Sequence, residues 1–165
     1  MTPAKEIRIM RTVKSLIILL IVALAIPMQA AAGSSGDAKI NWSSYAEAQK
    51  AGSNGRKYFI YFYSEHCGYC RRLESKAFSD TTVIDYINAN YTPVRVNAGE
   101  ETKLAASFGV QGVPDLRFLS PEGENIARWP GYIESNRLII MLRYIATDSY
   151  KSKNFGDFVK EQEKN

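Results

Sequence analysis

Ser64-Glu65-His66-Cys67-Gly68-Tyr69-Cys70-Arg71-Arg72 contains both cysteines of the 165-residue chain. It directly follows Tyr58 to Tyr63, an apolar run that is rich in aromatic residues. Two thiols separated by two residues, at a point where a strand pattern changes to a helix pattern, are typical of a redox-active pair. The stretch therefore predicts thiol–disulfide exchange.

A purely structural role explains this pair poorly. A disulfide that closes so short a loop constrains the unfolded chain little, and no other cysteine is present to staple distant elements. A closed zinc site needs four ligands, whereas the chain offers two cysteines and one histidine. A haem attachment motif needs histidine where the chain has Arg71. We therefore predict no metal, and no cofactor beyond a redox-active Cys67–Cys70 disulfide.

The two cysteines receive different roles from their positions on the predicted helix. Cys67 lies in the first turn, where unpaired backbone N–H groups and the positive end of the helix dipole stabilise a thiolate. It is the predicted attacking thiol, and Cys70, deeper on the same helical face, is the predicted resolving thiol. Gly68 and Tyr69 set how strongly the thiolate is favoured. His66 is a further tuning candidate if it is charged, and the alternative is an exposed loop residue without effect.

The N-terminus predicts export. Residues 1–32 combine a positively charged segment, an apolar stretch from Leu16 to Ile26, a proline, and three alanines at 30–32, which together are typical of a secretory signal peptide. An uncleaved anchor is the alternative, but the eleven apolar residues fall short of the roughly 20 that span a bilayer. We expect cleavage after Ala30 or Ala32 and a periplasmic or otherwise exported protein.

The chain beyond the predicted signal peptide is nearly neutral. Residues 1–32 hold four of the 21 basic and one of the 17 acidic residues, so residues 33–165 carry 17 against 16, a net charge of +1. A nucleic-acid partner therefore loses its main support. The remaining 133 residues suit a single domain, and we expect a monomer.

Strand and helix patterns alternate along the remaining sequence. The expected strands cover 57–63, 91–97, 115–120 and 125–129, and the expected helices cover 40–51, 67–78, 83–88, 101–108 and 133–146. The first two strands should be parallel through a right-handed crossover, and the last two should pair antiparallel. This order predicts an α/β domain whose mixed sheet of four to five strands has helices on both faces.

Three segments follow the predicted signal peptide. Residues 33–39 are expected to be a flexible leader, residues 40–147 the domain, and residues 148–165 a helical extension packed on it. We expect Ser43 or Ser44 to cap the first helix, and Thr82 to cap the third.

With these elements in place, the chain resembles the thioredoxin superfamily over residues 40–147. The resemblance is carried by Tyr58 to Cys70, Val94-Arg95-Val96-Asn97, Phe108 to Pro114, Gly123 and Gly131. Arg128-Trp129-Pro130-Gly131-Tyr132, Met141 to Ile145, and the spacing of Tyr150, Phe155 and Phe158 are similar to exported bacterial thioredoxins of the sulfur-oxidation (SoxW) type.

The resemblance implies a thioredoxin fold and a substrate site. Val113–Pro114 is expected to be a cis peptide beside Cys67, with the Val113 backbone pairing with a bound substrate. Gly68 and Tyr69 are expected to contact the substrate as well. Cys67 should be exposed, and Cys70 should be buried.

Three positions depart from the pattern of cytoplasmic thioredoxins. His66 stands where that family has Trp, Tyr69 where it has Pro, and Tyr61 where it has a buried Asp that accepts a proton. Glu65 or water is then a candidate acceptor for the Cys70 proton. Gly68-Tyr69 is also similar to periplasmic disulfide isomerases, which leaves the direction of electron flow open.

The leading hypothesis is an exported thiol–disulfide oxidoreductase that reduces protein or sulfur-carrier disulfides. Its partners would be disulfide-containing exported proteins and a membrane electron donor or acceptor of the thiol–disulfide relay type. A disulfide oxidase or isomerase is the alternative, although 133 residues leave no room for the dimerisation domain of similar isomerases. A copper carrier is a third hypothesis, which lacks soft ligands because Met141 is the single methionine after residue 32.

Overall fold

A computed structural model describes residues 38–162. The predicted signal peptide, residues 1–32, lies outside the described residues, as do residues 33–37 of the predicted leader. The sheet contains β1 (Lys57–Tyr63), β2 (Tyr91–Asn97), β3 (Asp115–Leu119) and β4 (Asn125–Pro130). Its strand order is β2-β1-β3-β4, with β1 and β2 parallel and the other two pairs antiparallel. The predicted mixed α/β sheet is confirmed.

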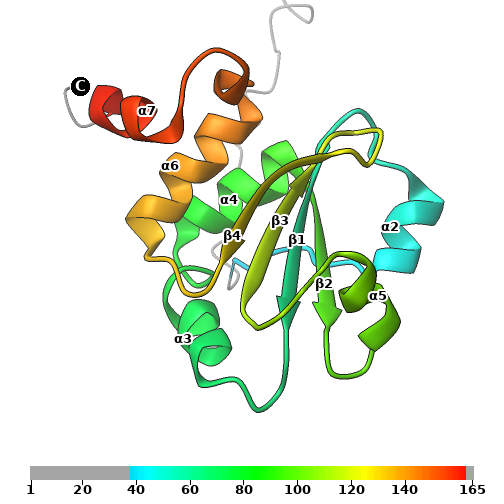
Figure 1. Cartoon of the computed structure of the whole chain (residues 1–165). Helices are drawn as coiled ribbons and strands as arrows, with labels where there is room; N and C mark the ends of the chain where they lie inside the picture. The colour runs from blue at the N-terminus through cyan, green and yellow to red at the C-terminus, as the bar shows by residue number, and fades with distance from the viewer. Residues whose placement is uncertain (1–37, 163–165) are drawn as a thin grey trace, which may run out of the picture. The chain divides into compact units, whose positions relative to one another are not determined.

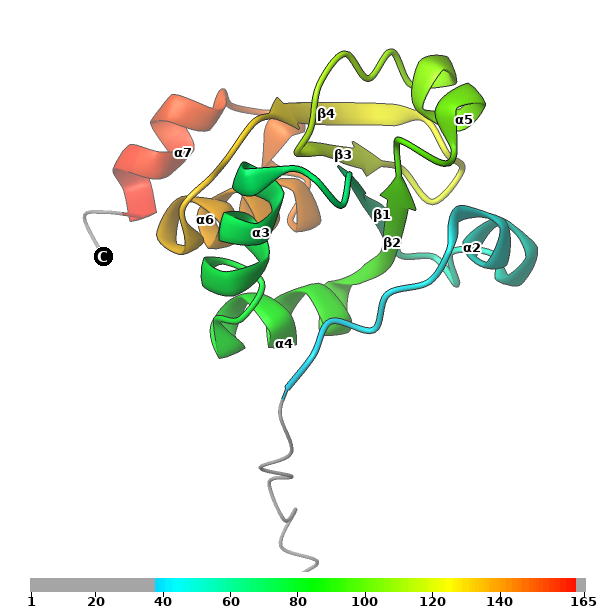
Figure 2. The same cartoon turned by 90° about the horizontal axis from the view of Figure 1, so that it is seen from below.

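Helices cover both faces of this sheet (Figures 1 and 2). They are α2 (Tyr45–Ala51), α3 (Gly68–Lys76), α4 (Thr81–Asn90), α5 (Thr102–Ser107), α6 (Ser135–Ala146), η1 (Ser149–Lys151) and α7 (Phe155–Gln162). Side chains of α3, α4 and α6 share one hydrophobic cluster, and those of α2 and α5 share the other. No helix within residues 38–162 is both long and apolar enough to cross a membrane.

The central strand β1 supplies both clusters. Phe59 and Tyr61 are fully buried on the α3 face, while Ile60 and Phe62 are fully buried on the α2 face. A strand that is covered on both sides needs a continuous apolar run rather than an alternating one. The continuous apolar run therefore predicted β1 correctly. Because β1 is packed on both faces, its end holds the start of the following turn rigidly in place.

The first helix begins later than predicted. Residues 40–43 are not helical, and Ser43 instead forms a parallel bridge with Val94 of β2. Ser43 donates its N–H to the Pro93 carbonyl at 3.1 Å and accepts from Arg95 N–H at 3.0 Å. The edge of β2 offers these backbone groups, and pairing them satisfies both partners. The helix then starts at Tyr45.

Caps explain where two helices begin. Ser44 forms a capping box with Glu47 at the start of α2, as one of the two predicted caps. The α4 helix begins at Thr81, because Asp80 rather than Thr82 caps it by accepting the Thr82 N–H at 2.9 Å.

Residues 148–162 contain the helices η1 and α7 and contact α6. The Tyr144 ring of α6 lies 5.4 Å from that of Phe155 and 5.3 Å from that of Phe158. The Tyr144 hydroxyl also donates to the Lys153 carbonyl at 2.6 Å. One aromatic side chain thus holds α7 through two ring contacts and a hydrogen bond.

Tyr91→Phe should lower the free energy of unfolding by about 1 kcal/mol. The buried Tyr91 hydroxyl donates to the Leu142 carbonyl at 2.6 Å and so ties β2 to α6. Urea unfolding followed by far-UV circular dichroism measures the change. Tyr45→Phe is the control, because within residues 38–162 the Tyr45 hydroxyl bonds only to Gln49, at an exposed position. Equal losses in both variants would contradict the assignment.

Candidate active site

The site is built where β1 passes into α3 (Figure 1). After β1 ends at Tyr63, the Cys67 N–H donates to the Ser64 carbonyl at 3.2 Å, which closes a turn. Cys67 is the N-cap of α3, with extended backbone, and the helix begins at Gly68. The predicted position of Cys67 at a helix N-terminus is therefore the observed one.

Cys67 and Cys70 form a disulfide. The Cys67 sulfur accepts the Cys70 N–H at 3.0 Å, so it fills the capping position that a side-chain oxygen fills in other helices. Cys67 is partly exposed, whereas Cys70 is 1% exposed. An attacking reagent therefore reaches Cys67 first, and the helix covers Cys70.

The chain preceding β3 lies against this disulfide. The Val113–Pro114 peptide bond is cis, and the Val113 carbonyl oxygen lies 3.5 Å from the Cys67 sulfur. Pro114 is buried, and Val113 is half-buried. The structure thus brings Cys67 and Cys70 together with Val113 and Pro114, although more than forty residues separate the two pairs in the sequence.

The remaining candidates lie on the open side of the disulfide. Gly68 is exposed, and Tyr69 is 63% exposed. The side chains of His66 and Glu65 are exposed, and within the described residues neither forms a hydrogen bond with the cysteines. Only the Glu65 backbone takes part in the site, because its carbonyl accepts from Arg71 at 3.0 Å. The tuning roles of His66 and Glu65 stay predictions without a contact to support them.

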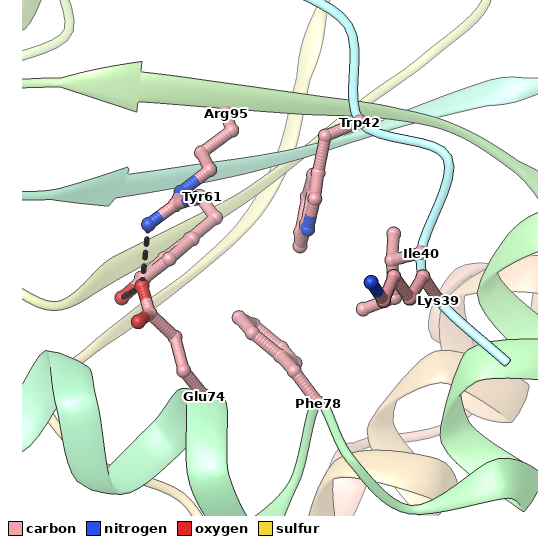
Figure 3. Close-up of a pocket in the computed structure, with 7 residues that line it drawn as sticks. All are labelled: Lys39, Ile40, Trp42, Tyr61, Glu74, Phe78 and Arg95. Atoms are coloured by element: carbon pink, nitrogen blue, oxygen red, sulfur yellow. Dashed lines mark hydrogen bonds and ion pairs between the residues drawn. The ribbon is translucent and has the colours of Figure 1, made fainter. Parts of the chain in front are cut away.

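Tyr61 meets a carboxylate on the buried side of α3. Its hydroxyl donates to Glu74 at 3.2 Å, and Arg95 pairs with the same carboxylate oxygen at 2.7 Å. Figure 3 shows the three side chains converging at one side of a hollow of about 240 Å³ that Trp42 and Phe78 also line. Burial, and secondarily Glu74, raise the pKa of Tyr61 well above its usual value, so Tyr61 stays protonated and acts as a donor.

Sequence reasoning missed Glu74 as a part of this site. Glu74 lies four residues after Cys70, a spacing that places two side chains on one helical face. That spacing was the available signal. The carboxylate next to Tyr61 is therefore supplied by Glu74 of α3, and not by the strand position that Tyr61 occupies.

A second unpredicted cluster follows the Val113–Pro114 peptide directly. Asp115 is fully buried and pairs with Arg117 at 2.6 Å and with Arg128 of β4 at 2.7 Å. The signal was a pair of opposite charges, Asp115 and Arg117, two residues apart in an expected strand, which places both on one face of the sheet. Because Asp115 anchors the first residue of β3 to β4, it also holds the loop that faces Cys67.

Asp115→Asn should lower the free energy of unfolding by about 3 kcal/mol, because Arg117 then keeps a buried charge with no compensating carboxylate. Urea unfolding of the oxidised protein measures the loss. Asp157→Asn is the matched control, since its ion pair with Lys160 is exposed and should contribute less than about 1 kcal/mol. A loss for Asp115→Asn no greater than the control's would remove the proposed anchoring.

This geometry is suited to thiol chemistry. A partly exposed sulfur sits at a helix N-terminus, where backbone N–H groups favour its thiolate over its thiol. A second, protected sulfur is already within bonding distance. Across residues 38–162, no group of three or more His, Cys, Asp or Glu side chains is placed to share a metal ion.

Comparisons with solved structures point to the same fold. A thioredoxin from Thermus thermophilus is 30% identical, with a TM-score of 0.60 over 65% of this chain and 87% of that one. A thioredoxin-fold protein from Helicobacter pylori has a TM-score of 0.59 over 77% of this chain and 85% of that one. At 20% identity, the second likeness concerns the fold alone.

Curated relatives match parts of the chain. An uncharacterized protein of Archaeoglobus fulgidus is 31% identical over 93 residues, which are 55% of this chain and 72% of that protein. The protein disulfide-isomerase erp38 of Neurospora crassa is 28% identical over 78 residues, which are 47% of this chain. The match spans only 21% of that isomerase.

Residues 45–146 match the family described as the thioredoxin-like domain. The match contains the disulfide, the cis peptide that faces it, and all four strands. The chain belongs to the thioredoxin-like domain family.

Proposed function

We propose that this thioredoxin-like thiol–disulfide oxidoreductase works outside the cytoplasm as a reductant of protein or sulfur-carrier disulfides. The observation that carries the proposal is the Cys67–Cys70 disulfide at the start of α3, with the accessible sulfur facing the Val113 carbonyl. The thioredoxin of Thermus thermophilus, at 30% identity, supports the reducing direction. The likeness to exported thioredoxins of the sulfur-oxidation type supports the substrate class.

The reduced pair transfers two electrons. The Cys67 thiolate attacks one sulfur of the substrate disulfide, forming a mixed disulfide and releasing the first substrate thiolate. Cys70 then loses its proton and attacks the Cys67 sulfur, which forms the Cys67–Cys70 disulfide and releases the second thiolate. The substrate is reduced and the protein oxidised. A membrane dithiol donor restores the pair by the reverse exchange.

A disulfide oxidase or isomerase is the second candidate. The observation in its favour is the match to a protein named as a disulfide isomerase, although that match spans only 21% of the relative. Gly68 and Tyr69 between the cysteines add to it. Both candidates use the same two sulfurs and differ in the reduction potential of the pair.

Export is supported by the sequence pattern of residues 1–32, which combines positive charges, an apolar stretch and small residues. The proposed partners are therefore disulfide-containing exported proteins and a membrane electron donor. The near neutrality of residues 33–165 fits protein partners better than nucleic acid. We propose that the protein acts as a monomer.

Cys70→Ser should accumulate mixed disulfides on Cys67, because the sulfur that resolves them is gone. The variant is expressed with its signal peptide, and adducts are detected by non-reducing electrophoresis of the exported fraction. The Cys67→Ser/Cys70→Ser double variant is the control and should show none. Equal adduct levels in the two variants would rule out attack by Cys67.

The reduction potential of the Cys67–Cys70 pair, measured against glutathione, should lie near about −270 mV, the value of thioredoxins. A donor with this potential transfers electrons readily to most protein disulfides. A measured value near about −120 mV would instead assign the protein to the oxidases.

A further inference from the structure

Tyr69 is the large apolar side chain that residues 38–162 leave most exposed, at 63%. It lies between the two cysteines, so a partner that reaches Cys67 also meets this ring. Its ring centroid lies 6.4 Å from that of Tyr132, and the Arg72 guanidinium lies 4.6 Å from the Tyr132 centroid. Exposed aromatic residues of this kind often anchor protein interfaces. An aromatic surface therefore continues from the disulfide to Tyr132.

Tyr132 also lines a hollow of about 330 Å³, which we name the α6–α7 groove. Its apolar walls come from Trp129 at the end of β4, Ile140 of α6 and Val159 of α7. Figures 1 and 2 show α7 lying beside α6. Val159 lies outside residues 45–146, which match the domain family. The C-terminal extension thus adds a wall next to the active-site surface.

This wall is held in place by packing rather than by the ligand. Phe155 of α7 contacts Trp129 at 6.3 Å between ring centroids. Phe158 is buried against Tyr144, whose hydroxyl bonds to the Lys153 carbonyl. A preformed groove costs a ligand less ordering entropy than one that closes on binding.

The groove also carries a cation that is available to a ligand. The Arg137 guanidinium lies 5.7 Å from the Trp129 ring centroid and 5.4 Å from that of Phe155, and among residues 38–162 no carboxylate pairs with it. Glu134, which also lines the groove, pairs with Arg72 at 3.4 Å. The unmatched charge of the groove is therefore positive, which favours a ligand that carries a carboxylate.

We propose that the α6–α7 groove binds the polypeptide segment that flanks the reactive cysteine of a substrate protein, and that this segment carries apolar side chains and an acidic residue. The inference rests on the proposed function. Tyr69 and Tyr132 connect the groove to Cys67, so one extended segment can occupy both. The apolar side chains pack against Trp129, Ile140 and Val159, and the acidic residue pairs with Arg137.

The test uses two synthetic peptides of equal length, each with one cysteine carried as a mixed disulfide with thionitrobenzoate. One has Leu, Phe and Asp beside the cysteine, and the other has Ser, Gly and Asn at those positions. Reduced protein attacks each peptide and releases thionitrobenzoate, whose absorbance gives the second-order rate. Wild type should prefer the apolar, acidic peptide by about tenfold, since 1.4 kcal/mol of added contact is a tenfold change.

Two variants separate the groove from general charge effects. Arg137→Glu should reduce the preference to about twofold or less, because it places a negative charge against the acidic side chain. Lys160→Glu makes the same charge change on the exposed side of α7 and should keep the preference. Ellman's reagent, which is too small to reach the groove, should react equally with all three proteins. Equal rates also show that each variant is reduced, and an unchanged far-UV circular dichroism spectrum shows that it is folded.

The possible outcomes distinguish failure of the proposed function from failure of the groove assignment alone. Slow reaction of wild type with Ellman's reagent would overturn the proposed function, and the groove assignment with it. Normal reaction with Ellman's reagent and equal rates for both peptides would overturn the groove assignment alone. Light scattering that shows a dimer of wild type and a monomer of Arg137→Glu, with no peptide preference, would assign the groove to a second copy of the chain and also overturn it.

Discussion

The hydrogen bond from the Cys70 N–H to the Cys67 sulfur sets the geometry on which the rest of the site depends. A helix leaves its first backbone N–H groups without partners, and here one of them is satisfied by sulfur instead of oxygen. The attacking atom is therefore stabilised by the same interaction that begins α3. This coupling works only because β1, buried on both faces, delivers the chain to that point. The packing of the sheet thus fixes the position of Cys67 as much as the start of the helix does.

Much of the fold could be predicted because its decisive patterns are local. The expected strands at 57–63 and 91–97 have the observed bounds of β1 and β2. The extended conformation of residues 40–43 could not be predicted, because Ser43 pairs with Val94, about fifty residues away. The apolar residues before Tyr45 do have helical spacing. Two backbone hydrogen bonds between Ser43 and the edge of β2 nevertheless hold this segment in an extended conformation.

The site shows the same division. Cys67 and Cys70 were evident from their spacing, and the resemblance to thioredoxins placed Val113 and Pro114 beside them. Polar side chains whose partners lie on other helices or strands were not predicted. Glu74 receives its partners from two strands, and Asp115 receives one from β4. Each of these side chains looks ordinary in sequence, because a charge in a helix or a strand is usually solvated.

The size of the charge effects at the site bears on the proposed reducing direction. The potentials of thioredoxins and of strong oxidases differ by about 150 mV, which corresponds to about 7 kcal/mol in the relative stability of the reduced pair. The His66 side chain is exposed and forms no hydrogen bond with either cysteine within residues 38–162, and an exposed charge contributes about 1 kcal/mol at most, or about 20 mV. Gly68 and Tyr69 add no charge. A charge at His66 alone therefore supplies a small part of this difference, which is consistent with the proposed reducing direction.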